Sequence, residues 1–158
     1  MILVATGTHL QQFNRLIEAV DNLVGDNAIN EKVVIQVGYS NYIPKNAKWF
    51  RFTGYADMVK LIKGSSIVIT HAGIGSVLLS VRLNKKTIVV PRLKKFGEHT
   101  NNHQLEIVKE LAKQRKIIPV YDISKLYAAI KNTKSFKPNK FEKSSVILDM
   151  VNKFLSIL

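Results

Sequence analysis

The sequence of 158 residues contains no cysteine. A disulfide scaffold, a thiolate metal site and a cysteine nucleophile are therefore excluded. No apolar run approaches the roughly 20 residues that a helix needs to span a bilayer. The first ten residues, MILVATGTHL, lack the basic region and the long apolar stretch of a secretory signal peptide, so we expect a cytoplasmic protein.

Acidic residues are scarce: 11 Asp and Glu stand against 24 Lys and Arg, which gives a net charge of +13. The excess lies beyond residue 50, because residues 1–50 contain four basic and four acidic side chains. A field of this sign favours an anionic partner, and nucleic acid, anionic lipid and nucleotide phosphates all fit it. A lysine-rich solvated surface is the alternative explanation. The hydrophobic fraction of 46% is typical of a globular chain, and this length suits one domain with a real core.

Short apolar runs alternate with amphipathic stretches along the chain. The runs predict strands at 2–5, 33–37, 48–52, 67–70, 87–90 and 117–120. The stretches predict helices at 13–24, 58–62, 75–83, 99–113 and 124–130, the last capped by Ser124. This alternation indicates an α/β fold, a doubly wound parallel sheet of about six strands that is Rossmann-like. We assign residues 1–130 to one ligand-binding domain and residues 131–158 to a basic linker and a C-terminal amphipathic helix from about residue 144.

Three strand-to-helix loops are candidate sites, because doubly wound sheets bind ligands beyond the carboxyl ends of their strands. They cover residues 6–9, 70–76 and 91–104. In the second loop, Gly73 and Gly75 would let the backbone approach a ligand closely. The amides of Gly75 and Ser76 at the following helix start would suit a diphosphate. A tight turn that needs positive φ is the alternative reason for these glycines.

Two familiar phosphate motifs are missing. No G-x-x-x-x-G-K-[ST] occurs, so a P-loop is excluded, and Leu78 stands where a dinucleotide fingerprint has its third glycine, which disfavours NAD. In the third loop, His99 and His103 are four residues apart and are predicted to share a helical face. No clear third ligand accompanies them and HExxH is absent, so we expect no metal site and no bound cofactor.

These loops, in this order, resemble the C-terminal, donor-binding half of glycosyltransferase family 28. The motifs are VATGT at 4–8 with Phe13, QVG at 36–38, HAGIGS at 71–76, and Pro91 with NHQ at 102–104. The chain is most similar to stand-alone catalytic subunits of two-part enzymes of this family. These include the eukaryotic dolichyl-diphosphate N-acetylglucosaminyltransferase catalytic subunit and bacterial polysaccharide-synthesis subunits. The resemblance covers residues 2 to about 130 and implies the donor-binding half of a GT-B fold.

The resemblance implies that a UDP-sugar binds at these loops. In the family, the segment matching 54–58 reads the uracil, the loop matching 71–76 meets the diphosphate, and the pair matching His103 and Gln104 contacts the sugar. The implied binding residues are Gly7, Thr8, Tyr55, Met58, Ala72, Gly73, Ile74, Gly75, Ser76, His103 and Gln104. Many relatives carry a ribose-binding Glu where this chain has Leu79. From the residues themselves, His9 and His71 are the candidates for acid–base catalysis or a phosphate contact, because histidine titrates near neutrality. A structural or ligand-positioning role is the alternative for either histidine.

A complete enzyme of this architecture has two domains, and this chain supplies one. The resemblance therefore implies a membrane-anchored acceptor-binding subunit, a lipid-linked sugar acceptor and inverting transfer at the cytoplasmic membrane face. The basic stretches 92–116 and 131–143 would dock on the partner or on an anionic membrane surface. Two alternatives stay open: a regulatory module that binds a nucleotide-sugar without turnover, and a nucleic-acid-binding module. The second is disfavoured because no nucleic-acid-binding signature accompanies the charge.

Overall fold

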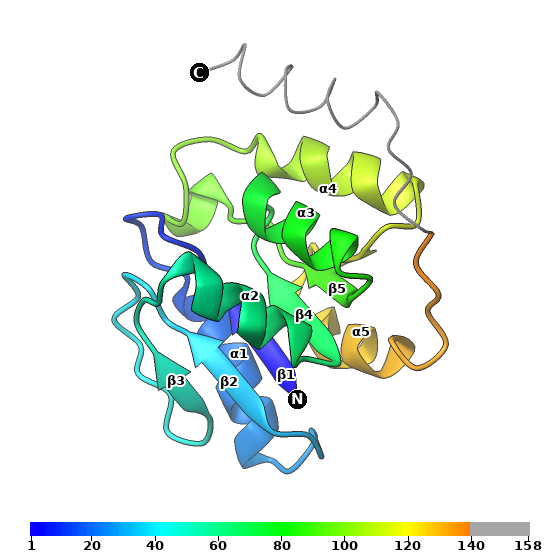
Figure 1. The fold of residues 1–158 in the computed structure, drawn as a ribbon. Coiled ribbons are helices and arrows are strands. Elements are labelled where there is room, and N and C mark those ends of the chain that lie inside the picture. Colours follow the sequence, from blue (N-terminus) through cyan, green and yellow to red (C-terminus); the bar gives the residue numbers. More distant parts are fainter. Residues whose placement is uncertain (140–158) are drawn as a thin grey trace.

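The computed structural model describes residues 1–139, which form one parallel sheet flanked by helices (Figure 1). The strands are β1 Ile2–Ala5, β2 Val33–Gln36, β3 Lys48–Phe50, β4 Ile67–Thr70, β5 Lys86–Val89 and β6 Ile118–Pro119. The helices are α1 Asn14–Gly25, α2 Tyr55–Lys63, α3 Ile74–Arg82, α4 Gln104–Lys113 and α5 Leu126–Asn132, with 3₁₀ turns η1 Lys94–Phe96 and η2 Ile123–Lys125. The predicted α/β class and the six-stranded parallel sheet are confirmed.

Alternate side chains of the central strand β1 enter two different cores. Ile2 and Val4 pack with the apolar stripe of α1, which includes Leu16 and Val20. Leu3 points to the other face, where it packs with residues of α2 and β4. A period of two along a strand places neighbours on opposite faces, so a run that is apolar throughout must be covered on both. Figure 1 shows this arrangement, with α2 and α3 in front of the sheet and α1 behind it.

In the strand order β3-β2-β1-β4-β5-β6, the first three strands are added toward one edge of the sheet and the last three toward the other, so the order switches beside β1. Ala5, the last residue of β1, is in register with Gln36 of β2 on one side and with Thr70 of β4 on the other. The loops that follow β1 and β4 therefore leave the sheet side by side, at its topological switch point. Ligands of doubly wound sheets bind at this place.

Several predicted boundaries are wrong. The helix expected over residues 99–113 begins only at Gln104, and η1 was not predicted. Ser124 caps no helix: α5 has Lys125 at its N-cap position, and the side-chain cap belongs to η2, where the Asp122 carboxylate accepts the N–H of Ser124 at 3.0 Å. The strand expected over residues 48–52 ends at Phe50, and α2 begins at Tyr55, three residues earlier than predicted.

The C-terminal part of the prediction is only partly visible. The α5 helix continues to Asn132, into the segment predicted as a linker. The amphipathic helix expected from about residue 144 lies outside the described residues. Within residues 1–139, no helix is both long enough and apolar enough to cross a membrane. The same residues contain no group of three or more metal-ligating His, Asp or Glu side chains.

Candidate functional site

The His71 ring lies between the loop after β1 and the loop after β4. A Cβ added to Gly7 would lie 2.5 Å from His71 Cε1, and one added to Gly73 would lie 2.1 Å from His71 Nε2. Both distances are far below van der Waals contact, so the ring itself requires glycine on each side. Gly7 also has a φ of +79°, a conformation that side-chain-bearing residues rarely adopt. The two loops predicted as parts of one site are thus in contact through this histidine.

The hydrogen bonds around His71 indicate its tautomer. The Thr70 hydroxyl donates its single hydrogen to the carbonyl oxygen of Ala5 at 2.9 Å. The same hydroxyl oxygen lies 3.3 Å from His71 Nδ1, so it accepts a hydrogen from that nitrogen. We infer that Nε2 carries the lone pair. Burial, and next the positive charge of Arg92, lower the pKa of His71 to about 3, so the imidazole is neutral at pH 7.

Neither the neighbouring atoms nor the backbone conformation requires a glycine at position 75. Among residues 1–139, a Cβ built on Gly75 meets nothing within 4 Å, and the φ of this residue is not positive. The explanation that Gly73 and Gly75 serve a positive-φ turn is therefore wrong for both residues. The first helical hydrogen bond of this segment runs from the Val77 N–H to the Gly73 carbonyl oxygen at 3.2 Å. The amides of residues 74–76 precede it and have no partner within the helix, as an anion site requires.

His9 and His99 form a stacked pair that joins the loop after β1 to the loop after β5. Their ring centroids are 4.7 Å apart and the rings are inclined by 30°. Each Nδ1 accepts a backbone N–H from the residue two positions later, Gln11 and Asn101, at 3.3 Å. Each neutral ring therefore carries its hydrogen on Nε2. Partial burial and the charge of Arg92 lower the pKa of both histidines. His99 also lowers the pKa of His9, and His103 lowers that of His99.

The predicted helical face shared by His99 and His103 does not exist. Residues 99–103 form bends and a turn before α4, in which His99 Nδ1 holds the Asn101 N–H. The Asn101 side-chain oxygen in turn accepts the His103 N–H at 3.1 Å. Such local bonds from side chain to backbone compete with helical ones, which explains the late helix start. His99 joins the site through His9, and His103 stands at the start of α4.

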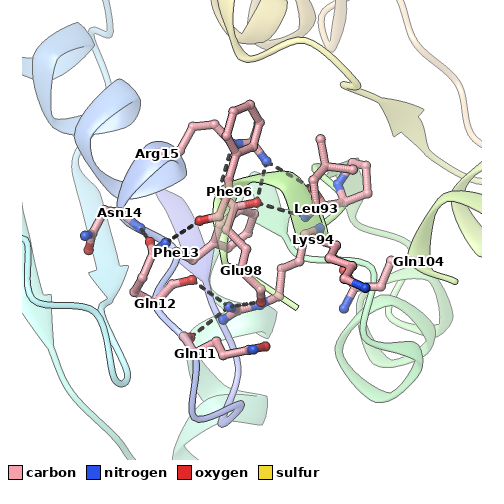
Figure 2. A network of polar contacts seen from close by, with 12 residues as sticks. Gln11, Gln12, Phe13, Asn14, Arg15, Leu93, Lys94, Phe96, Glu98 and Gln104 are labelled. Atoms are coloured by element: carbon pink, nitrogen blue, oxygen red, sulfur yellow. Dashed lines mark hydrogen bonds and ion pairs between the residues drawn. The ribbon is translucent and has the colours of Figure 1, made fainter. Parts of the chain in front are cut away.

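Sequence reasoning missed a buried ionic network that underlies these loops (Figure 2). Arg15 Nε and Nη2 each donate to a Glu98 carboxylate oxygen at 2.9 Å, and the Glu98 side chain is fully buried. Arg92, 1% exposed, donates to four carbonyl oxygens, those of Thr6, Gln11, Gln12 and Glu98, at 2.8–3.2 Å. The network therefore fixes the loop after β1 against the loop after β5. Arg15 and Glu98 are 83 positions apart, so no local sequence pattern links them.

Two polar residues near the end of β2 hold the loop after β1 from its other side. The Gln36 side-chain oxygen accepts the Gly7 N–H at 3.1 Å. The Ser40 hydroxyl oxygen accepts the Phe13 N–H at 2.8 Å. A polar, buried glutamine at the end of an apolar strand is a sequence signal for such a role, since buried polar groups must be paired.

The remaining predicted residues lie in different surroundings. Thr8 is exposed, and Tyr55, at the start of α2, is 76% exposed. Met58 and Leu79 are partly buried and pack against the apolar cluster beneath α2 and α3. The Met58 N–H donates to the Gly54 carbonyl oxygen at 3.0 Å. The amides without a partner inside this helix are therefore those of residues 55–57. Leu79 stands at the position where many relatives carry a ribose-binding glutamate, and here its side chain packs against apolar residues.

With this geometry in place, comparison with known proteins is informative. The model of the glycosyltransferase family 28 C-terminal domain matches residues 1–155. A curated relative, UDP-N-acetylglucosamine transferase subunit ALG13 of Mus musculus, is 37% identical over 87 residues, which are 52% of this chain and 7% of the mouse protein. The protein of the same name in Yarrowia lipolytica is 31% identical over 129 residues, covering 75% of this chain and 63% of the relative. The chain thus spans less than two thirds of either relative.

Solved structures agree on the fold. The NMR solution structure of ALG13 superposes with a TM-score of 0.60 at 21% identity, covering 89% of this chain and 88% of that one. The glycotransferase of kitacinnamycin superposes with a TM-score of 0.65 at 17% identity, covering 85% of this chain and 34% of that enzyme. At these identities the likeness concerns the fold alone.

Proposed function

This chain belongs to glycosyltransferase family 28, as its C-terminal domain, and from this membership we propose that it is the donor-binding subunit of a UDP-sugar-dependent glycosyltransferase. It would transfer a hexose or N-acetylhexosamine, with inversion, to a lipid-diphosphate-linked acceptor. The names of the curated relatives, transferase subunits for UDP-N-acetylglucosamine, support the donor class. The observation that carries the proposal is the open glycine loop at the switch point, where the start of α3 presents its amides.

The proposed diphosphate site uses dipoles and neutral groups. The amides of residues 74–76 at the start of α3 would bind the phosphates, with Gly7 and Thr8 facing them from the loop after β1. The Nε2–H of neutral His9 is a further donor for the departing UDP. His103 would face the sugar, and residues 55–58 would face the uracil. The support for this arrangement is that the three strand-end loops are joined by His71, by the His9–His99 stack and by Arg92.

In the proposed reaction, an acceptor hydroxyl oxygen attacks the anomeric carbon of the sugar. The bond from that carbon to the β-phosphate oxygen breaks, UDP leaves with the electron pair, and the hydroxyl proton passes to a base. Fixed donors around the departing diphosphate stabilise its charge without reorganising, which lowers the barrier. His71 Nε2 would be a weak proton acceptor, because it lies beneath Gly7 and Gly73 and burial lowers the pKa of His71 to about 3. A base from a partner subunit would complete the site.

The acceptor half is proposed to come from a second, membrane-anchored subunit. The support is the word subunit in the names of the curated relatives, together with the exposed apolar side chains around the candidate site. Leu10 is 74% exposed and Tyr39 is 51% exposed, and they stand in the loops after β1 and β2. The assembly would work at the cytoplasmic face of the membrane, where the lysine-rich surface suits anionic lipids.

Calorimetric titration of the full chain with UDP tests the donor site. We expect binding at micromolar to millimolar UDP and weaker binding of ADP. Gly75→Ala, at the start of α3, should bind UDP more weakly. Its matched control is Gly64→Ala, at the end of α2 on the opposite edge of the sheet, which should leave binding unchanged. Absence of heat at millimolar UDP, with correctly folded protein, would refute the proposal.

Transfer is tested with membranes from the source organism after deletion of the gene for this chain. Added chain should restore the incorporation of radiolabelled sugar from UDP-sugar into an organic-extractable lipid. Binding of UDP without restored incorporation would favour the non-catalytic, nucleotide-sugar-binding alternative. Salt-sensitive retention of RNA or DNA on filters, with no effect of UDP, would instead favour the nucleic-acid alternative.

A further inference from the structure

Gln104, the first residue of α4, joins two of the strand-end loops. Its side-chain oxygen accepts the Arg92 N–H at 2.9 Å and the Ala72 N–H at 3.3 Å. All three residues are buried, with 6%, 1% and 0% of their surface exposed. Because both neighbours are N–H donors, only the oxygen of the amide can face them, which fixes the orientation of the side chain.

These two bonds connect the glycine loop to the most strongly anchored part of the site. Ala72 directly precedes Gly73, the residue that caps α3. Arg92 is bonded through its guanidinium to the carbonyl oxygens of Thr6, Gln11 and Gln12. Gln104 therefore couples the position of the glycine loop to that of the loop after β1. Without this oxygen, two buried N–H groups would lose the acceptor that they share, which is costly.

We propose that Gln104 is a positioning residue, whose oxygen holds the glycine loop in the geometry that receives the diphosphate. The family resemblance assigns this glutamine to the donor sugar, but here its oxygen is already occupied by the protein backbone. A residue that acts through the loop affects every ligand that the loop binds. Its loss should weaken UDP and UDP-sugar by the same factor, whereas the loss of a sugar contact would weaken UDP-sugar alone. The ligand in this inference rests on the proposed function.

The test replaces Gln104 by methionine, which has a similar length but offers only a weak thioether acceptor. Gln114→Met is the matched control at the C-cap of the same helix, because among residues 1–139 the Gln114 side-chain amide donates to the Glu110 carboxylate and not to a strand-end loop. In Gln104→Met we expect the amide hydrogens of Ala72 and Arg92 to exchange about tenfold faster by NMR. We also expect the affinities for UDP and for UDP-N-acetylglucosamine to fall by one common factor of about ten. Gln104→Glu keeps an acceptor oxygen, so slow exchange should return at both amides.

Other results would overturn the inference. Unchanged UDP affinity with weakened UDP-N-acetylglucosamine binding would make Gln104 a direct sugar contact. Unchanged exchange at both amides in Gln104→Met would show that the oxygen does not hold the loop. If the wild-type chain binds neither nucleotide, the proposed function fails, and the exchange data decide the positioning role alone. Fast exchange in the Met variant with slow exchange in the Glu variant then supports it, and any other pair of results rejects it.

Discussion

Replacing Gly75 by alanine should raise the stability of this protein and at the same time weaken its affinity for nucleotide. In the described part of the chain the added Cβ meets nothing within 4 Å, and the residue already has an ordinary backbone conformation in the first turn of α3. Alanine is favoured over glycine in helices by about 0.5–1 kcal/mol. For a domain of this size that gain corresponds to a rise in melting temperature of about 1–4 °C.

The same methyl group would stand where the diphosphate has to approach the amides of α3. A hydrogen bond to a charged group contributes about 1.5–3 kcal/mol, so the loss of one such bond weakens binding about 10- to 100-fold. Thermal unfolding by circular dichroism measures the first effect, and calorimetric titration with UDP measures the second. Opposite signs of the two effects are the signature of a glycine retained for ligand approach.

The control for this experiment is Gly64→Ala, at the far end of α2. A Cβ there makes ordinary contact, 3.4 Å from the Lys60 carbonyl oxygen, and Gly64 has helical backbone angles. We expect a small change in stability and unchanged UDP affinity. If Gly75→Ala binds UDP as tightly as the wild type, the phosphates do not bind at this helix start and the reasoning is wrong.

Three further predictions concern the surroundings of the loop. Burial lowers the pKa of His71 to about 3 from an unfolded value of 6.5, so as the pH falls the unfolded chain takes up this proton before the folded chain does. The free energy of unfolding should therefore fall by about 2 kcal/mol between pH 7 and pH 5, as measured by urea unfolding. If His71 is the cause, the fall should be smaller in His71→Asn. Glu98→Gln breaks a buried ion pair with Arg15 and should lower the free energy of unfolding by about 2–4 kcal/mol. Asp57→Asn, in an exposed pair, should lower it by less than about 0.5 kcal/mol. Equal losses would contradict the importance assigned to the buried network. Gly73→Ala should destabilise the protein by about 1–3 kcal/mol, because the added methyl group clashes with the imidazole of His71. This loss of stability should be smaller in a His71→Ala background. Purely additive effects in this double-mutant cycle would count against the clash.

The sheet and its central strands could be predicted because their signal is local. The runs at residues 2–5 and 67–70 coincide with β1 and β4, and their continuous apolar character reflects burial on both faces. The same logic placed the candidate loops correctly at the carboxyl edge. Helix ends were less predictable: the start of α4 depends on bonds between side chain and backbone at His99 and Asn101, and an apolar periodicity carries no trace of these.

The inner structure of the site could not be predicted, because its contacts join residues far apart in the chain. Arg92 reaches the carbonyl oxygen of Thr6 across 86 positions, and its burial is invisible in a sequence where it stands among exposed lysines. The glycines illustrate the same limit. The pattern indicates that Gly73 and Gly75 matter, but only the three-dimensional arrangement shows that Gly73 makes room for an imidazole, whereas a Cβ on Gly75 would contact none of residues 1–139.

The charge of the chain also acquires a more specific meaning from the structure. Two cations nearest the candidate site, Arg15 and Arg92, are directed to Glu98 and to backbone carbonyl oxygens, so they stabilise the protein's own loops. Burial first, and the charge of Arg92 after it, lower the pKa of His71 and of His9. What the site offers an anion is therefore a set of backbone amides and neutral imidazoles, held in place by buried charge. In the proposed function, fixed dipoles of this kind would bind the diphosphate and let it leave again after transfer, and the exposed lysines would attract an anionic surface.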